Sequence, residues 1–360
     1  MHMVTPMRLA TAGVSNMEQA LGLFRDIMKL KLERRGHVPA SLLKSWKLPG
    51  RTKARYAELS CKGYAIGRLR LVEFTPTPKQ KVRIDFGPSA VDTATDVGPK
   101  ALDFYVADPI LSSVRKIEAA GFKFRSPPVK HQIASSVSEE CLFSGPDGIP
   151  ILIMVGHVHA RTSLRAGSPD GPFSEIPTIS ICAGDLKKTR AFYAGVLGLT
   201  AVTDAETPDQ YRDLVDKLTG VPQGTRIHFL LYGKPPEASG KILLVHFFEQ
   251  TGKRLKNRMK PGHLGFTLLT HDTDEIDALH GRLKAFGAKI VTPPTTISDD
   301  GRPYRMMLVQ GPNEEMFEFT DFSKMKPVKP KARAKKTPRP KAKTKPKSGK
   351  KPKARAKRKR

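Results

Sequence analysis

The chain repeats itself, and a repeat of this length constrains the possible folds more than any other feature of the sequence. The text IEAAGFKFRSPPVK, which starts at Ile117, returns as LKAFGAKIVTPPTT, which starts at Leu283. Three features of the first copy recur 166 residues later in the second. They are Gly121 and Gly287, the proline pairs 127–128 and 293–294, and the Gly-Pro pairs 145–146 and 311–312. Three coincidences at a single offset indicate a duplicated unit.

A second repeated pair lies upstream of the first. GVSNMEQALGLFRDIMKL matches CAGDLKKTRAFYAGVLGL at an offset of 169 residues. Each copy passes through Asn16 or Asp185, residue types that cap the start of a helix, and continues as an amphipathic helix. The second copy closes with Gly198, which suits the end of a helix, whereas the first copy has Lys29 there.

The repeats divide the chain into two similar halves of about 160 residues, each with two modules that read strand, helix, then strands. The expected helices are Met17–Met28, Ile110–Ala120, Leu186–Leu197 and Asp274–Phe286. The expected strands are Ile66–Phe74, Leu102–Val106, Ile149–Val155, Thr178–Cys182, Ile227–Leu231, Ile242–Phe248, His263–Leu269, Arg305–Val309 and Met316–Thr320. These elements predict an α+β fold.

Composition divides the chain further. We expect a first domain at 1–159, a linker rich in Gly, Ser and Pro at 160–176, a second domain at 177–323 and a tail at 324–360. In the tail, 20 of 37 residues are Lys or Arg, with no acid and no aromatic residue, and they supply 20 of the net +29 charges. Such a segment cannot bury a core, so we expect it to be disordered.

Several classes of protein are excluded by the same reading. No apolar run approaches the 18 to 20 residues of a membrane helix, and the longest unbroken one is Ile151–Val155. The first residues lack the pattern of a secretory signal. Cys61, Cys141 and Cys182 are widely spaced and odd in number, which is not a disulfide framework. We therefore expect a cytoplasmic protein in a reducing compartment.

The second half carries text that is typical of one superfamily: AFYAGVLGLTAV from Ala191, PGHLGFTLL from Pro261 and LVQGPNEEMFEFTDF from Leu308. This text resembles the vicinal oxygen chelate superfamily, which includes glyoxalase I, extradiol dioxygenases, methylmalonyl-CoA epimerase and the bleomycin- and fosfomycin-resistance proteins. The first half matches more loosely, so the resemblance covers most of residues 7–322. It implies four βαβββ modules in two tandem domains, each with a cupped sheet that holds a metal ion or a substrate.

Strand alternation predicts which side chains face the cup. Phe317 and Phe319 share one face and should pack on a helix, so Glu318 points into the cup. In HLGFTLL, Leu264, Phe266 and Leu268 form the packed face, which turns His263 toward the cup. His246 lies on a strand that is expected to edge the same cup, on the face of Ile242 and Leu244.

The resemblance implies a metal site in the second half, at Thr178, His246, His263 and Glu318. His246, His263 and Glu318 are competent ligands, and two imidazoles with one carboxylate suit Fe(II), Mn(II), Ni(II) or Zn(II). Thr178 departs from the histidine of many members. The alternative is that these histidines are structural, as most strand histidines are.

The equivalent positions in the first half are Leu9, Arg70, Ala101 and Leu152, which predict a metal-free half. This half either supports the other or binds a ligand through Arg70, Asp103 and Tyr105. Those three residues can equally form a buried polar cluster. Tyr304 is a further candidate for substrate contact.

Three functions follow as hypotheses. The first is a divalent-metal-dependent lyase, isomerase or dioxygenase acting on a small substrate with neighbouring oxygens, in which the metal is a Lewis acid or a dioxygen site. No subclass is favoured, because Leu308 and Glu314 depart from the extradiol signature. The second is a metal-free binding protein of the resistance type. The third is a nucleoid-associated protein whose residues 324–360 bind nucleic acid or another polyanion without base readout.

Overall fold

The computed structural model describes residues 3–61, 63–157, 164, 172–299 and 302–323. Residues Met1–Met325 form one compact unit built on two eight-stranded sheets. The predicted tail, 324–360, and most of the predicted linker, 160–176, lie outside the described residues. Among the described residues, no helix has both the length and the apolar character needed to cross a membrane.

Sheet I has the strand order β14-β15-β16-β13-β1-β4-β3-β2, and sheet II has the order β10-β11-β12-β9-β5-β8-β7-β6. The strands of sheet I are β1 (Leu9–Val14), β2 (Lys31–His37), β3 (Lys53–Ser60), β4 (Arg68–Thr75), β13 (Gly265–Asp272), β14 (Lys289–Asp299), β15 (Arg302–Gln310) and β16 (Met316–Asp321). The strands of sheet II are β5 (Gly98–Tyr105), β6 (Val129–Ile133), β7 (Ser136–Ser144), β8 (Pro150–Gly156), β9 (Thr178–Ala183), β10 (Thr200–Glu206), β11 (Ile227–Gly233) and β12 (Lys241–Phe247).

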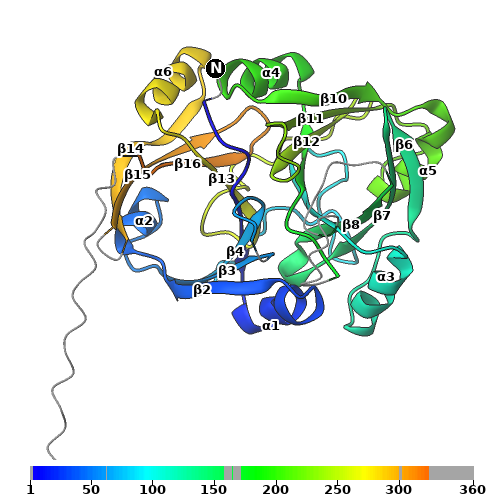
Figure 1. The fold of residues 1–360 in the computed structure, drawn as a ribbon, viewed down its shortest axis with the longest axis horizontal. Helices are drawn as coiled ribbons and strands as arrows, with labels where there is room; N and C mark the ends of the chain where they lie inside the picture. Colours follow the sequence, from blue (N-terminus) through cyan, green and yellow to red (C-terminus); the bar gives the residue numbers. More distant parts are fainter. Residues whose placement is uncertain (1–2, 62, 158–163, 165–171, 300–301, 324–360) are drawn as a thin grey trace, which may run out of the picture. The chain divides into compact units, whose positions relative to one another are not determined.

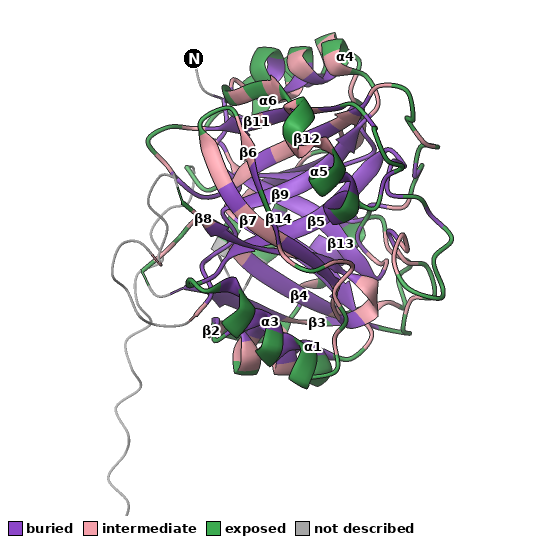
Figure 2. Cartoon of the chain, turned by 90° about the vertical axis from the view of Figure 1, so that its right-hand side faces the viewer, coloured by how far each residue is buried: buried purple, intermediate pink, exposed green. Residues whose placement is uncertain are grey.

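Most of the helices lie on the outer sides of the sheets, where Figure 2 shows exposed helices around largely buried strands. The α-helices are α1 (Met17–Leu21), α2 (Ala40–Ser45), α3 (Ile110–Ala119), α4 (Leu186–Arg190), α5 (Arg212–Thr219) and α6 (Ile276–Phe286). Short π- and 3-10 segments are η1 (Gly22–Ile27), η2 (Pro146–Gly148), η3 (Ala191–Val196) and η4 (Asp209–Tyr211). The α+β fold with four strand-helix-strands modules is confirmed, and the modules are β1–β4, β5–β8, β9–β12 and β13–β16.

The upstream repeat folds the same way twice. In both copies a short α-helix continues as a π-helix, α1 into η1 and α4 into η3. The predicted N-caps are confirmed, because the Asn16 side chain accepts from the Gln19 N–H and the Asp185 side chain accepts from the Lys188 N–H. The duplication therefore preserves local structure as well as sequence.

Each sheet combines modules from both halves of the chain. The antiparallel pair β1 and β13 joins the first module to the fourth, and the antiparallel pair β5 and β9 joins the second to the third. Figure 1 shows this pairing as blue strands that lie beside yellow and orange ones. The predicted halves, 1–159 and 177–323, are therefore the two copies of the sequence repeat. The two modules that share a sheet come from different halves.

Candidate functional site

Glu318 lies on the concave side of sheet I, as alternation predicts, while Phe317 and Phe319 are fully buried on the opposite face. Three donors engage its carboxylate. Trp46 Nε1 donates to Oε2 at 2.7 Å, and Arg70 Nη2 and Thr270 Oγ1 each donate to Oε1 at 3.1 Å. An ion pair with Arg70 thus stands where the resemblance implies a metal ligand.

His263 does not reach Glu318. In the sheet Glu318 is paired with Thr270, and His263 precedes Thr270 by seven residues along the chain. At about 3.3 Å per strand residue, these two positions are roughly 20 Å apart. His263 Nδ1 instead contacts the Arg258 carbonyl oxygen at 2.9 Å.

His246 lies in the other sheet. It is on β12 of sheet II, and its Nδ1 contacts the Ala183 carbonyl oxygen at 2.9 Å. It shares a face with Ile242 and Leu244, as predicted, but that face packs into the main core, while Leu243 and Val245 line the concave side. The prediction of one cup holding His246, His263 and Glu318 is therefore wrong, because modules pair across the halves and His246 faces away from its own cup.

The remaining positions implied by the resemblance do line the two cups. Leu9, Arg70 and Glu318 line cup I, the cavity on the concave side of sheet I, and Ala101, Leu152 and Thr178 line cup II, the cavity on the concave side of sheet II. Only Glu318 in this set is a good ligand for a divalent cation, and it is already paired. Within the described part of the chain, no group of three or more His, Cys, Asp or Glu side chains is arranged to hold a metal ion. The residues present do not fit the implied metal.

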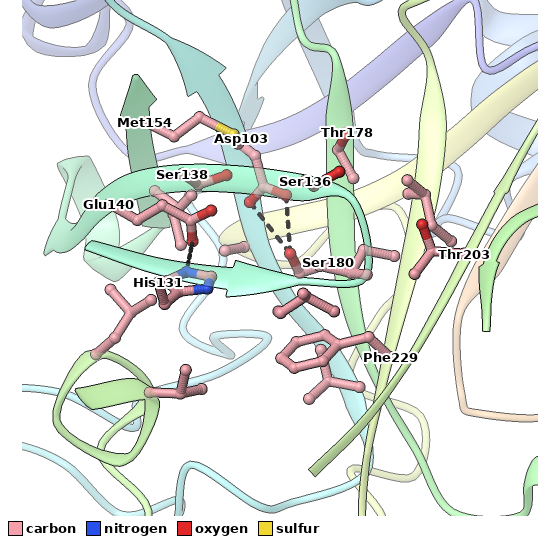
Figure 3. A pocket seen from close by; sticks show the side chains of 18 of the residues that line it. Asp103, His131, Ser136, Ser138, Glu140, Met154, Thr178, Ser180, Thr203 and Phe229 are labelled. Atoms are coloured by element: carbon pink, nitrogen blue, oxygen red, sulfur yellow. Dashed lines mark hydrogen bonds and ion pairs between the residues drawn. The ribbon is translucent and has the colours of Figure 1, made fainter. Parts of the chain in front are cut away.

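Cup II has a volume of about 410 Å³ and is the candidate functional site. Strands of the second and third modules form its walls, and α5 contributes Val215, Leu218 and Thr219. Most of the wall is apolar; its apolar members include Leu142, Leu152, Met154, Phe229, Leu231, Leu243 and Val245. Figure 3 shows polar side chains gathered at one part of this wall, around Asp103 and Ser180.

Asp103 is the most deeply placed acid of cup II, with 1% of its surface exposed. It lies on β5, and the Ser180 hydroxyl of the neighbouring strand β9 donates to both carboxylate oxygens, at 3.2 and 2.9 Å. Burial raises the pKa of Asp103 well above its usual range; the Ser180 hydrogen bond opposes this rise, and the charge of Glu140 adds to it. A protonated Asp103 carboxyl both donates and accepts hydrogen bonds.

His131 and Glu140 form a second polar pair in the same wall, from the hairpin of β6 and β7. His131 Nε2 lies 3.4 Å from a Glu140 carboxylate oxygen, and His131 is 5% exposed. Burial alone would lower the pKa of His131, but the charge and hydrogen bonding of Glu140 outweigh burial and raise this pKa. The pair therefore favours an imidazolium beside a carboxylate.

Two lysines also line cup II, mainly through their stems. Lys100 Nζ donates to the Ala94 carbonyl oxygen at 2.9 Å, and Lys241 Nζ donates to the Ala238 carbonyl oxygen at 2.5 Å. Burial lowers the pKa of both amines. Because the amino groups are held by backbone carbonyls, their methylene stems extend the apolar wall.

Of the residues predicted for a ligand in the first half, Asp103 and Tyr105 line cup II and Arg70 lines cup I. Sequence reasoning missed Ser180, His131 and Glu140. Alternation from Thr178 places Ser180 on the same face, so a signal existed for that residue. The hairpin that carries the other two was not among the predicted strands.

The sequence model of the Glyoxalase/Bleomycin resistance protein/Dioxygenase superfamily matches residues 175–319. Glyoxalase I from Zea mays is structurally similar, with a TM-score of 0.58 at 13% identity over 88% of this chain and 92% of the maize chain. A Bacillus subtilis protein provisionally named a dioxygenase gives a TM-score of 0.55 at 12% identity over 90% of this chain and 87% of its own. A search of curated proteins gave no match.

Residues 175–319 match the superfamily model, and the four modules of the described residues have the vicinal oxygen chelate fold. The two similar structures support the fold over both halves of the chain. In fold, the chain is thus similar to glyoxalase I and to a protein named as a dioxygenase, with four modules in two composite sheets.

Proposed function

We propose that this protein binds a small, mainly apolar organic molecule in cup II and acts on it without a protein-held metal ion. The composition of cup II carries the proposal: a cavity of about 410 Å³ with an apolar wall and one buried Asp103–Ser180 pair. Ligand pockets typically have volumes of 300–1,000 Å³ and combine such walls with a few convergent polar groups. The binding part of this proposal corresponds to the second hypothesis from the sequence, a metal-free binding protein of the resistance type.

The protonation state of Asp103 determines which polar group of a ligand can bind beside it. A neutral carboxyl donates to a carbonyl or hydroxyl oxygen and avoids the cost of burying a charge. We therefore propose a ligand whose polar group at Asp103 is neutral. A substrate with neighbouring oxygens satisfies this requirement when it presents a carbonyl oxygen to Asp103.

As an enzyme, cup II supports proton transfer. A protonated Asp103 hydrogen-bonds the carbonyl oxygen and stabilises the negative charge that develops when a neighbouring carbon loses a proton. Glu140 is the candidate base, with His131 beside it as the group that holds its carboxylate charge. The reaction class that fits is that of an isomerase or lyase. A protein that only sequesters a ligand would need the same cavity but not the Glu140 base.

The neutral aromatic alcohol 2-naphthol tests the proposal, titrated into the full chain by calorimetry. We expect saturable binding that EDTA leaves unchanged. Leu218→Trp, which fills cup II from α5, should abolish binding, and Asp103→Leu should weaken it about tenfold while Asp103→Asn retains it. Leu111→Trp, at an exposed position of α3, is the control and should change nothing. Absence of binding, or equal binding by Leu218→Trp, contradicts the proposal.

The composition of residues 324–360 favours a second function. Twenty Lys and Arg residues in 37 positions neutralise phosphates, so we propose non-specific association with nucleic acid through this segment. Deleting residues 324–360 should remove retention on DNA at moderate salt, and the affinity of the full chain should fall by about 0.9 log units per log unit of salt for each phosphate contact. Unchanged retention after the deletion refutes this role.

A further inference from the structure

Cup I is a second cavity, of about 470 Å³, and its chemistry differs from that of cup II. It lies between the first and fourth modules, on the concave side of sheet I. Its charged members are Arg8, Arg34, Arg70, Glu58 and Glu318, and each arginine has an acidic partner: Asp272, Glu58 and Glu318 respectively. Its aromatic members are Trp46, Tyr56, Tyr304 and Phe322. Aromatic walls with guanidinium groups that keep unused N–H donors suit a flat organic anion.

Arg70 is the central cation of cup I. Its side chain is 10% exposed, its Nε donates to Thr11 Oγ1 at 2.9 Å, and its Nη2 donates to Glu318 Oε1 at 3.1 Å. The guanidinium lies over the Trp46 ring, 5.2 Å from the centroid. Across the described residues, no protein acceptor engages its second amino group, Nη1. A buried guanidinium that lines a cavity with unused donors is prepared for an oxygen-bearing ligand.

Arg8 is a second arginine of the cup I wall. Its Nε donates to both oxygens of Asp272, at 3.0 and 2.8 Å, which fixes the guanidinium at the cavity wall. The same group lies 5.8 Å from the centroid of the Phe322 ring. Both arginines are therefore held rigidly by an acid and an aromatic ring, which lowers the entropy cost of binding.

We propose that cup I is a second ligand site, which takes the carboxylate of a small aromatic acid through Arg70 and Arg8. The ligand ring packs against the aromatic wall that includes Trp46 and Tyr304. This site is independent of the function proposed for cup II, because none of the described residues lines both cavities. Arg70 stands at a position that the superfamily resemblance assigns to a metal ligand, and its guanidinium supplies a positive charge there.

Trp46 provides a direct test, because it is the only tryptophan of the chain. Benzoate is titrated into the full chain while the Trp46 fluorescence is recorded, and benzamide, its uncharged isostere, is the matched ligand control. We expect a saturable change with benzoate and binding of benzamide at least about tenfold weaker. Equal responses to both compounds, or none to benzoate at millimolar concentration, overturn the proposal.

A charge-neutral double variant, Arg70→Met with Glu318→Gln, tests the role of Arg70 without leaving either buried charge unpaired. Calorimetry should show benzoate binding at least about tenfold weaker than in the parent chain. Arg25→Gln with Asp26→Asn, which removes an exposed ion pair at unchanged net charge, is the matched control and should bind normally. Unchanged affinity in the double variant overturns the assignment. If this variant does not fold, the benzoate and benzamide comparison still decides.

Discussion

At the residue scale, buried ionisable groups outside the cups set how stability depends on pH. Glu315 is fully buried, accepts a hydrogen bond from the Tyr193 hydroxyl at 2.7 Å and another from the Asn313 N–H at 2.6 Å. Burial raises the pKa of Glu315 to about 7, against the opposing effect of these hydrogen bonds. His271 is also fully buried, and burial lowers its pKa to about 4.

The sign of the Glu315 contribution follows from proton linkage. Between the unfolded pKa of 4.5 and the folded pKa of about 7, the folded state binds more protons, so the free energy of unfolding falls as pH rises. The loss across this range is on the order of 3 kcal/mol. We expect Glu315→Gln to remove it, as urea unfolding at several pH values would show. His271 has the opposite effect: between its folded pKa of about 4 and its unfolded pKa of 6.5, the free energy of unfolding rises with pH. Because His271 is present in both the parent and the variant, its contribution cancels in the comparison. Identical pH profiles for parent and variant contradict this assignment.

At the element scale, the two helix ends of the upstream repeat differ in one backbone position. Gly198 follows the second helix with φ of +72°, and Lys29 follows the first with φ of +63°. A residue with a Cβ atom is disfavoured in this left-handed region, whereas glycine adopts it freely. The first copy therefore retains a strained end where the second does not.

Exchanging these residues tests the strain. Lys29→Gly should stabilise the chain by about 1 kcal/mol, and Gly198→Lys should destabilise it by a similar amount, in chemical unfolding. The matched control is Gly50→Lys, which has no positive φ and open space around its Cβ position. Destabilisation by Lys29→Gly would contradict this prediction. It would show that contacts of the Lys29 side chain stabilise the fold by more than its left-handed backbone conformation destabilises it.

The sequence predicted the modules because their signals are local. The helix caps at Asn16 and Asp185 and the alternation around Glu318 depend on neighbouring residues, and each is found in the structure. Which two modules share a sheet depends on contacts between residues far apart in the sequence. Because the four modules are similar, the sequence does not indicate which of them pair. That choice separates His246 from Glu318 and brings Arg70 to Glu318 instead.

At the scale of the whole molecule, cross-pairing of the modules creates two cups with different chemistry. Cup II is apolar with a buried Asp103–Ser180 pair, and cup I is polar and rich in arginine. Among the residues that the structure describes, neither cup assembles the metal site that the resemblance implies, since most of the equivalent positions carry Leu, Ala, Thr or Arg. We therefore propose that side chains act on the ligands of both cups by hydrogen bonding and ion pairing, without a protein-held metal ion.

The metal content of the purified full chain tests this claim most directly. Elemental analysis after dialysis against Fe(II), Mn(II), Ni(II) or Zn(II), each offered anaerobically and then removed, should give far less than one equivalent per chain. Glu318→Gln should give the same value, because Glu318 is engaged by Arg70, Trp46 and Thr270. One retained equivalent that Glu318→Gln or His263→Ala removes would contradict the account and restore the predicted metal site.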